Sequence, residues 1–258
     1  MDTVSIGKHN PRLVDVRKAV QRGTLTADGL LPIEGPRLIG EAHSSGLPIV
    51  ALFVREDVDA KALPPATSVF TLDSSTFKSL QSTEHSQGAI ALVKPRTWEL
   101  ADIVGDRAPI TVLAELQDPG NVGTILRVSE SFGAAGCIAL SGTASIHNSK
   151  VTRASAGSVF RLPWLWDLEW DNLVSVLKSR DIPIVGTSPH ATDSITSWDW
   201  DRPAAILIGN EGAGLSSLQV QACTAILKIP HEPQTESLNS AIAASVVLYE
   251  AYRRRIPR

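Results

Sequence analysis

The sequence predicts an α/β protein with two domains, a small N-terminal one and a larger C-terminal one built on a mostly parallel sheet. Short apolar runs of strand character alternate with segments of helical period along most of the chain. The stretch 95–109, which mixes proline, glycine and charge, interrupts this alternation and is expected to be a linker. The length of 258 residues is sufficient for two cores. We therefore expect domains at residues 1–94 and 110–258.

The N-terminal domain is predicted from two successive α/β patterns. A helix over residues 10–22 places apolar side chains on one stripe, and its basic residues lie mostly elsewhere on the wheel. Pro36 begins a second helix that is expected to end at Gly46. The remaining expected elements are strands at 49–54, 68–72 and 88–94 and a helix at 75–82. Together they indicate a small domain with helices packed on a sheet.

The C-terminal domain is predicted from five short apolar strands separated by helices. The expected strands are Ile110–Leu116, Cys137–Leu140, Ile184–Thr187, Ala204–Ile208 and Ala225–Ile229. The expected helices span residues 122–132, 150–159, 171–180, 216–222 and 237–254. Such alternation favours a parallel sheet covered on both faces. In such sheets ligands bind at the carboxyl ends of the strands, so the loops that follow them are of interest.

Composition excludes several classes of protein. The hydrophobic content of 43% with 20% charged residues is typical of globular chains, and no apolar run is long enough to span a bilayer. The N-terminus lacks the apolar core of a secretory signal, and the two cysteines, Cys137 and Cys223, are expected to be buried free thiols. These features predict a cytoplasmic protein without a metal site. The net charge of −3 means that a polyanionic partner requires a local basic patch.

The first loop of interest lies within "LQDPGNVGTILRVSESFG", residues 116–133. Asn121 falls where a helix N-cap belongs, which is its simplest structural interpretation. Arg127 lies among apolar positions of the same helix and therefore has to reach an edge, a carboxylate or a phosphate. An internal salt bridge and a functional role are both open for Arg127.

The second loop lies within "AAILIGNEGAGLS", residues 204–216, where an apolar strand runs into three glycines. The spacing is neither that of a dinucleotide-binding loop nor that of a P-loop. Glu211 would also repel phosphate, which argues against a nucleoside triphosphate. Glu211 either accepts hydrogen bonds from nearby backbone or has a role in a site.

The third loop precedes a long helix in "LKIPHEPQTESLNSAIAASVVLYEAYRRR", residues 227–255. Ser237 is a candidate N-cap for that helix. The helix carries a face of small residues suited to close packing against another helix, from this chain or a second copy. The arginines at 253–255 complement the helix C-terminus and are also candidate phosphate contacts.

Taken in order, the three segments "DPGNVGTILRVSESFGA", "LIGNEGAGLS" and "IPHEPQTESLNSAIAASVVLYEAYRR" resemble the three signature motifs of the SpoU-TrmH family of RNA ribose 2′-O-methyltransferases. The resemblance covers essentially the whole second domain. The segments "HNPRLVDVRKAV" and "PIEGPRLIGEA" also resemble the small RNA substrate-binding domain of many members. The resemblance implies a deep trefoil knot in the parallel-sheet domain, S-adenosylmethionine as cofactor, and a homodimer formed through the knotted domain.

The resemblance also implies roles for particular residues. The family's key catalytic positions fall on Asn121, Arg127, Glu211, Ser237 and Asn239. The cofactor contacts implied by the family pattern are Thr187, Leu207, Gly209, Asn210, Gly214, Ile229, Leu238 and Asn239. No metal is implied.

The expected reaction is attack of a ribose 2′-hydroxyl on the sulfonium methyl group, for which alignment supplies most of the rate gain. The family mechanism gives Arg127 the role of base, but a guanidinium hardly ever loses its proton in proteins. We therefore favour the hypothesis that the planar guanidinium of Arg127 donates hydrogen bonds to both a phosphate and the nascent alkoxide. These bonds would lower the pKa of the hydroxyl. Asn121 and Asn239 would orient ribose or Arg127, and Glu211 and Ser237 would fix the loops.

The small N-terminal domain favours large-subunit ribosomal RNA over transfer RNA, because family members that act on transfer RNA more often lack it. The candidate RNA contacts are Arg12, Arg17, Lys18, Arg22 and Arg37. A non-catalytic RNA-binding or ribosome-assembly protein with the same fold is the main alternative function. A Rossmann oxidoreductase is disfavoured by the absence of the dinucleotide fingerprint and by Glu211.

Overall fold

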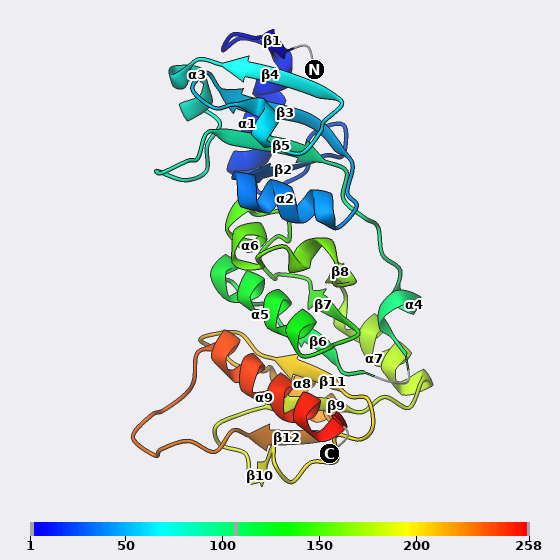
Figure 1. Ribbon diagram of the computed structural model, residues 1–258. Coiled ribbons are helices and arrows are strands. Elements are labelled where there is room, and N and C mark those ends of the chain that lie inside the picture. Colours follow the sequence, from blue (N-terminus) through cyan, green and yellow to red (C-terminus); the bar gives the residue numbers. More distant parts are fainter. Residues whose placement is uncertain (1–2, 106–107, 257–258) are drawn as a thin grey trace. The chain divides into compact units, whose positions relative to one another are not determined.

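The computed structural model describes residues 3–105 and 108–256, which form two compact units. The first unit contains the described residues up to Thr97 together with 145–160, and the second contains those of 98–144 and 161–256. Figure 1 shows the elements of both units in the colours of the sequence. Of the helices within the described ranges, none is both long and apolar enough to cross a membrane.

The first unit is built on a five-stranded sheet. Its strands are β1 (Thr3–Ser5), β2 (Leu31–Glu34), β3 (Ile49–Arg55), β4 (Ser68–Leu72) and β5 (Ala89–Val93). They lie in the order β1-β4-β3-β5-β2. β4 is parallel to both of its neighbours, whereas β5 is antiparallel to β3 and to β2. The sheet is therefore mixed.

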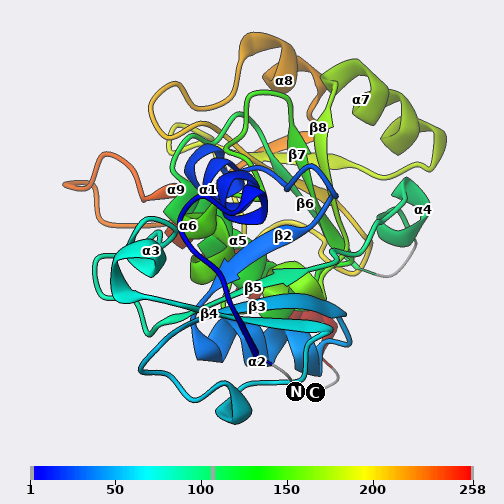
Figure 2. The same cartoon turned by 90° about the horizontal axis from the view of Figure 1, so that it is seen from above.

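Helices cover both faces of this sheet. They are α1 (Pro11–Arg22), α2 (Pro36–Ser44), α3 (Ser74–Lys78) and α6 (Ser149–Ala154), with short 3-10 turns at Ala60–Ala62 and Ser158–Phe160. Leu13 of α1 and Phe77 of α3 share a core with Phe53 of β3. Figure 2 shows α1 and α2 on opposite sides of the strands. Asn10 caps α1 by accepting from the amide of Arg12, and the left-handed Gly23 ends it.

The second unit is built on a seven-stranded sheet in which every pairing is parallel. Its strands are β6 (Ile110–Leu113), β7 (Gly136–Leu140), β8 (Trp164–Leu168), β9 (Ile184–Thr187), β10 (Asp193–Ser194), β11 (Ala205–Ile208) and β12 (Ala225–Lys228). Their order is β10-β12-β9-β11-β6-β7-β8. The α/β class and the parallel sheet predicted from the alternating pattern are confirmed.

Helices cover both faces of the parallel sheet as well. They are α4 (Leu100–Ile103), α5 (Pro119–Ser131), α7 (Trp170–Ser179), α8 (Ser217–Ala222) and α9 (Ser240–Arg255). One face packs against α4 and α7, whose Ile103, Leu173 and Leu177 join its core. On the other face α5 and α9 pack against each other, and Figure 1 shows α9 (red) in front of β9, β11 and β12. The strands β6, β7 and β11 are buried along their whole length, which explains why they are almost entirely apolar.

Some elements differ from the sequence prediction. The predicted linker contains α4 and contributes Ile103 and Val104 to the core of the second unit, while its residues 106–107 lie outside the described part of the chain. The proposed domain boundaries stay a prediction. The short strands β2, β8 and β10 were not predicted.

Two helices begin at other caps than expected. Asp118 caps α5, because its carboxylate accepts from the amide of Gly120 and Pro119 occupies the first helical position. Asn121 is therefore inside the first turn rather than at the cap. Asn239 caps α9 in place of Ser237. Both corrections leave the side chains of Asn121 and Ser237 available for other contacts.

Candidate functional site

Three loops of the second unit meet at one edge of its sheet. Residues 114–118 follow β6, residues 209–216 follow β11, and residues 229–239 follow β12. Because β6, β9, β11 and β12 are parallel neighbours, their carboxyl ends lie at the same edge. The topology thus brings together the three segments singled out in the sequence.

A cavity of about 620 Å³ lies among the loops that follow β9, β11 and β12. Its size is in the range of small-molecule sites. Its lining includes the predicted cofactor contacts Thr187, Gly209, Asn210, Gly214, Ile229, Leu238 and Asn239, and the predicted catalytic residues Glu211 and Ser237. Leu207 differs, because the side-chain alternation along β11 turns it into the fully buried core next to α4 and α7.

The lining of the cavity combines apolar and polar side chains. Its apolar side chains include Ile208, Leu215, Val220, Ile226 and Leu238. Its titratable side chains are His190, Glu211, His231 and Glu236, and among the described residues that line it there is no lysine or arginine. A polyphosphate ligand would find no cationic partner here, whereas an adenosyl group with a positively charged sulfonium suits the apolar walls and the carboxylates.

The loop after β11 is held in a tight hairpin by Asn210. Its backbone pairs with that of Gly214 in both directions, and its Oδ1 accepts from the amides of Gly212 and Ala213. A Cβ on Gly209 would lie 2.7 Å from the carbonyl carbon of Gly214, so only glycine allows this close approach. The Asn210 amide also donates to the carbonyl of Glu115, at 2.8 Å. This contact ties the loop after β11 to the loop after β6.

Glu211 strengthens that connection. Its carboxylate accepts from the backbone amides of Gln117 and Asp118, at 3.1 and 3.2 Å, and from Nδ2 of Asn121, at 3.1 Å. Burial alone would raise the pKa of Glu211, but these hydrogen bonds outweigh it and hold the pKa below its ordinary value. The anionic side chain of Glu211 therefore holds the first motif in place through three hydrogen bonds.

Asn121 and Asn239 extend this network to the third motif. Nδ2 of Asn239 donates to Oδ1 of Asn121 at 3.1 Å, while Oδ1 of Asn239 accepts from the amides of Ala241 and Ile242 at the start of α9. Each amide group donates to the next acceptor, and the series ends at the carboxylate of Glu211. This chain of two hydrogen bonds, from Asn239 to Asn121 and from Asn121 to Glu211, joins all three motifs and is called the relay below.

Arg127 lies outside this relay. It is exposed on α5, on the side opposite the buried Val122, Ile125 and Leu126. Among the described residues, no ion pair or hydrogen bond of its guanidinium is found. The internal salt bridge considered from the sequence is thus not formed, and the guanidinium is available for a ligand. Neither Arg127 nor Asn121 lines the cavity itself.

The candidate RNA contacts of the first unit fall into two groups. Arg12 lies over the ring of Phe70, 5.4 Å from its centroid, and Arg17 donates to the carbonyl and hydroxyl of Ser79. Lys18, Arg22 and Arg37 are exposed. Arg12 and Arg17 already make contacts within the chain. Lys18, Arg22 and Arg37 are therefore the better candidates for phosphate binding.

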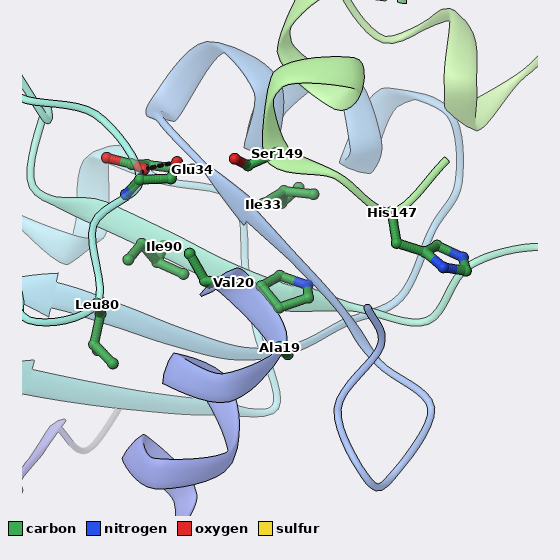
Figure 3. A pocket seen from close by; sticks show the side chains of 10 residues that line it. Ala19, Val20, Ile33, Glu34, Leu80, Ile90, His147 and Ser149 are labelled. Atoms are coloured by element: carbon green, nitrogen blue, oxygen red, sulfur yellow. Dashed lines mark hydrogen bonds between the residues drawn. The ribbon is translucent and has the colours of Figure 1, made fainter. Parts of the chain in front are cut away.

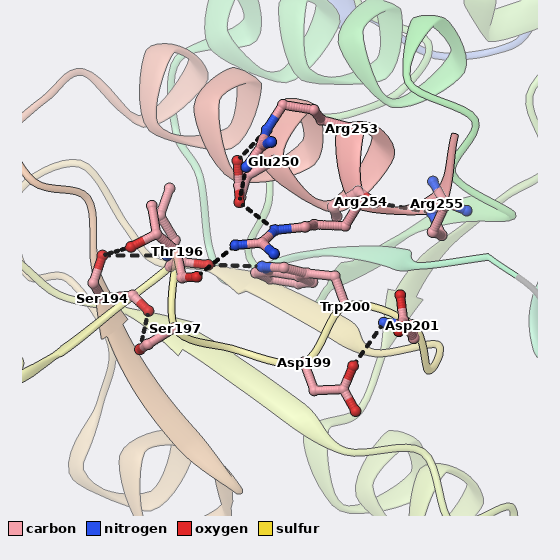
Figure 4. Close-up of polar contacts among 12 residues, drawn as sticks. Ser194, Thr196, Ser197, Asp199, Trp200, Asp201, Glu250, Arg253, Arg254 and Arg255 are labelled. Atoms are coloured by element: carbon pink, nitrogen blue, oxygen red, sulfur yellow. Dashed lines mark hydrogen bonds and ion pairs between the residues drawn. The ribbon is translucent and has the colours of Figure 1, made fainter. Parts of the chain in front are cut away.

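The arginines at the end of α9 have intramolecular roles (Figure 4). Arg253 and Arg254 both donate to the buried carboxylate of Glu250, and Arg254 also donates to the carbonyl of Thr196. Arg255 donates to the carbonyls of Ala251 and Phe132. These contacts fix the C-terminal helix and argue against the sequence-based suggestion that these arginines bind phosphate.

A second, much smaller cavity lies in the first unit (Figure 3). Its volume of about 10 Å³ corresponds to one water molecule at most. It is lined by Glu34, His147 and Ser149 among others. Hydrogen bonds from Ser82 and Thr83 offset the burial of Glu34 and keep its pKa below the ordinary value. The cavity is a packing feature rather than a ligand site.

Sequence reasoning missed three titratable residues that line the large cavity: His190, His231 and Glu236. All three follow the carboxyl ends of β9 or β12, where ligands bind in parallel sheets. That position was the signal that could have identified them. His231 and Glu236 lie within the third motif, whereas His190 lies outside all three motifs and joins the cavity only because β9 and β12 are neighbours.

Comparison with known proteins now decides the family. Residues 108–249 match the model of the SpoU rRNA Methylase family. This chain belongs to that family. The resemblance inferred from the three motifs is confirmed.

Individual SpoU relatives agree with this assignment. A 23S rRNA (guanosine-2′-O-)-methyltransferase RlmB of Burkholderia sp is 30% identical over 191 residues, which cover 72% of this chain and 77% of that protein. An uncharacterised tRNA/rRNA methyltransferase of Synechocystis sp. is 39% identical over 144 residues, 56% of this chain and 53% of that protein. The chain therefore spans about half the length of the latter relative.

A solved SpoU structure resembles almost the whole chain. The crystal structure of the methyltransferase AviRb from Streptomyces viridochromogenes, in complex with AdoMet, superimposes with a TM-score of 0.86 at 27% identity. The match covers 96% of this chain and 98% of that one. The similarity thus extends through both units, beyond the residues that the family model matches.

Proposed function

We propose that this SpoU family member transfers a methyl group from S-adenosylmethionine to a ribose 2′-hydroxyl of RNA. The observation that carries the proposal is the cavity at the edge of the parallel sheet, which the second and third motifs line and to which the relay from Asn239 through Asn121 to Glu211 connects the first motif. The AdoMet complex of AviRb and the rRNA methyltransferase names of the relatives support it.

The residues of the cavity fit the cofactor. Ile226, Leu215 and Leu238 offer apolar contacts to the adenosyl group, and the backbone of the loops after β11 and β12 offers hydrogen bonds. Glu236 and Glu211 provide negative potential near a sulfonium cation. When bound, the cofactor supplies an electrophilic methyl group.

The protein's own contribution to the reaction is alignment and charge. The relay fixes the first turn of α5 against the start of α9, so the 2′-hydroxyl and the methyl group meet in a defined geometry. Arg127 binds a substrate phosphate and the developing alkoxide through its planar fork, which favours loss of the hydroxyl proton. Ser237 is exposed at the cavity and contributes a hydroxyl to the same loop.

The substrate we propose is large-subunit ribosomal RNA, with transfer RNA as the second candidate. The α/β unit that precedes the methyltransferase motifs supports ribosomal RNA, as do relatives that act on 23S rRNA by name. Lys18, Arg22 and Arg37 are exposed cations of that unit and would contact phosphates. A cytoplasmic location is proposed with this substrate.

We also propose a homodimer formed through the knotted domain. Several large apolar side chains of α9 and of its C-cap are exposed: Ile242, Tyr249, Tyr252 and Ile256. Tyr249 and Tyr252 cluster with Phe132 at the end of α5, with ring centroids 5.6 and 6.0 Å apart. Such a patch favours a protein partner. Conversion of the dimer to a monomer by Tyr249→Glu in light scattering would support this face as the interface.

The trefoil knot is part of the same proposal. From β11 the chain passes β9 to reach β12, and then returns across the sheet so that α9 packs against α5. This path is compatible with a C-terminal segment threaded through an earlier loop, as in the family. An experimental structure of the cofactor complex would test the threading directly.

A methyl-transfer assay tests the function. Purified protein and radiolabelled S-adenosylmethionine are incubated with separate pools of unmethylated ribosomal and transfer RNA, with Arg127→Ala as the control. We expect label in the large-subunit ribosomal RNA, resistant to alkali at the modified linkage and absent with the variant. Cofactor binding without label in either pool or in assembling ribosomal particles would instead favour a non-catalytic RNA-binding protein.

A further inference from the structure

The first turn of α9 leaves one backbone amide without an acceptor. The first N–H groups of a helix have no partner inside it and depend on capping groups. Oδ1 of Asn239 accepts from the amides of Ala241 and Ile242, and the carbonyl oxygen of Asn239 accepts from the amide of Ala243. For the remaining amide of this turn, that of Ser240, no acceptor is found among the described residues. The positive end of α9 therefore has an unused donor.

The side chain of the same residue also has no partner. Ser240 is only 8% exposed, and its hydroxyl is buried without a hydrogen-bond partner among the described residues. Such burial costs free energy, and buried hydroxyl groups are therefore nearly always paired. The other serine of α9 follows this rule, because Oγ of Ser245 donates to the carbonyl of Ala241 at 2.6 Å. An amide and a hydroxyl of one residue are thus both unused at the start of α9.

Ser240 belongs to the wall of the large cavity. It lines the cavity together with Asn239 and Ala243. Its Oγ is shielded in the structure, so contact with a molecule in the cavity requires a turn about the Cα–Cβ bond from one staggered position to another. The gain of a partner for a buried hydroxyl would favour that turn.

The cavity offers few other donors to an anion. Among the described residues that line it there is no lysine or arginine, and its imidazoles are those of His190 and His231. Both ring nitrogens of His231 already lie against backbone carbonyl oxygens. A helix N-terminus binds an anion through backbone amides and the helix dipole, without a cationic side chain. The start of α9 is therefore suited to an anionic group of a ligand in this cavity.

We propose that the amide and the hydroxyl of Ser240, at the N-terminus of α9, bind the carboxylate of the amino acid portion of S-adenosylmethionine. The proposal rests on the proposed function, because it assigns one group of the cofactor to one wall of the cavity. The amino acid portion also carries an ammonium group. Glu236, four residues before Ser240, lines the same cavity and has the opposite charge.

Two ligands that differ only in the carboxylate test this assignment. Titration calorimetry on the full chain compares S-adenosylmethionine with decarboxylated S-adenosylmethionine, which keeps the adenosyl group, the sulfonium and the amine. For Ser240→Ala we expect about tenfold weaker binding of S-adenosylmethionine, which corresponds to one hydrogen bond to a charged group. The decarboxylated ligand should lose at most roughly twofold, because the group that Ser240 binds is missing. An equal loss for the two ligands, or no loss for either, would overturn the proposal.

Two further variants serve as comparisons. Ser245→Ala removes a hydroxyl of the same helix that already has a partner, and it should bind both ligands as the wild type does. His190→Gln tests the other donor of the cavity, which is exposed. A loss confined to S-adenosylmethionine in His190→Gln, without one in Ser240→Ala, would assign the carboxylate to His190 and overturn the proposal.

Thermal unfolding without added ligand gives a readout independent of binding. Because the hydroxyl of Ser240 has no partner in the described chain, Ser240→Ala should melt at or above the wild-type temperature. A clearly lower melting temperature would show that the hydroxyl stabilises the fold, and would overturn the proposal. If the wild type binds neither ligand, the proposed function itself fails. If it binds S-adenosylmethionine and only the selective loss is missing, the function stands and the assignment to Ser240 alone is wrong.

Discussion

Arginines at two places in the second unit behave in opposite ways. Arg127 lies in the middle of α5, exposed, and its guanidinium has no polar partner among the described residues. Arg253, Arg254 and Arg255 end α9, the helix that packs on α5, and each donates to a carboxylate or a carbonyl of the chain. Among the described residues, the guanidinium of Arg127 is thus available, whereas each arginine of the cluster makes contacts within the chain.

The difference teaches that the density of positive charge along the sequence does not show which guanidinium is left available for a ligand. The three arginines that end α9 are the more conspicuous feature of the sequence, but their N–H groups donate to the Glu250 carboxylate and to backbone carbonyl groups (Figure 4). Arg127 is surrounded in sequence by apolar residues that turn inward and leave it outside. An exposed guanidinium without a polar partner among the described residues suits the proposed role of binding a phosphate.

The largest expected effect is that of Arg127→Ala. Because the removed guanidinium stabilises charge in the transition state, single-turnover methyl transfer should fall by about 100-fold or more. The melting temperature should stay near the wild-type value, since the side chain is exposed. Arg127→Lys should recover little, because an ammonium lacks the planar fork. Near-normal turnover of the lysine variant would contradict this geometry.

A smaller loss is expected when the relay is cut. Asn121→Leu removes the donor to Glu211 and the acceptor for Asn239 at once. Cofactor affinity measured by calorimetry should fall by roughly tenfold, which is the size of one lost hydrogen bond to a charged group. Asn172→Leu, an exposed site on α7, is the matched control. Equal affinities of the two variants would show that the relay does not hold the site.

Glu250→Gln tests the engaged cluster by its pH dependence. Hydrogen bonds from Arg253 and Arg254 hold the pKa of Glu250 below its ordinary value. The stabilisation is therefore present above the unfolded pKa of about 4.3 and is lost as pH falls through the folded pKa.

At neutral pH the variant should melt about 2 to 4 °C below the wild type, and the difference should shrink progressively as the pH falls below the unfolded pKa. Methyl transfer per folded molecule should not change. A loss of turnover as large as that of Arg127→Ala would remove the distinction between the two groups of arginines.

The smallest effects concern binding of RNA. If Arg22 contacts a phosphate, Arg22→Gln should reduce the slope of log affinity against log salt by about 1. Arg254→Gln should leave the slope unchanged, because its guanidinium is already bound to Glu250 and Thr196. Filter binding over a salt series measures both slopes. A reduced slope for the Arg254 variant would return the terminal cluster to the RNA-binding surface.

Most of the second unit could be predicted from the sequence. The strands at 184–187 and 205–208 were placed correctly because they are buried on both faces and bounded by polar loops. The helix caps were placed less well, since several polar residues near each start can cap and only the backbone decides among them. Asp118 rather than Asn121, and Asn239 rather than Ser237, fill those positions.

The sequence by itself determined the α/β class, the family and the residues of the three motifs, because these depend on residue type and order along the chain. Only the tertiary structure decided how those residues are used. The side chain of Leu207 is buried in the core. Hydrogen bonds join Asn239, Asn121 and Glu211, although Asn121 and Asn239 are 118 positions apart in the sequence. The ring of His231 lies between two backbone carbonyl groups. The physical reason is that hydrogen bonds and burial depend on which strand ends are neighbours, and neighbourhood in a parallel sheet does not follow chain order.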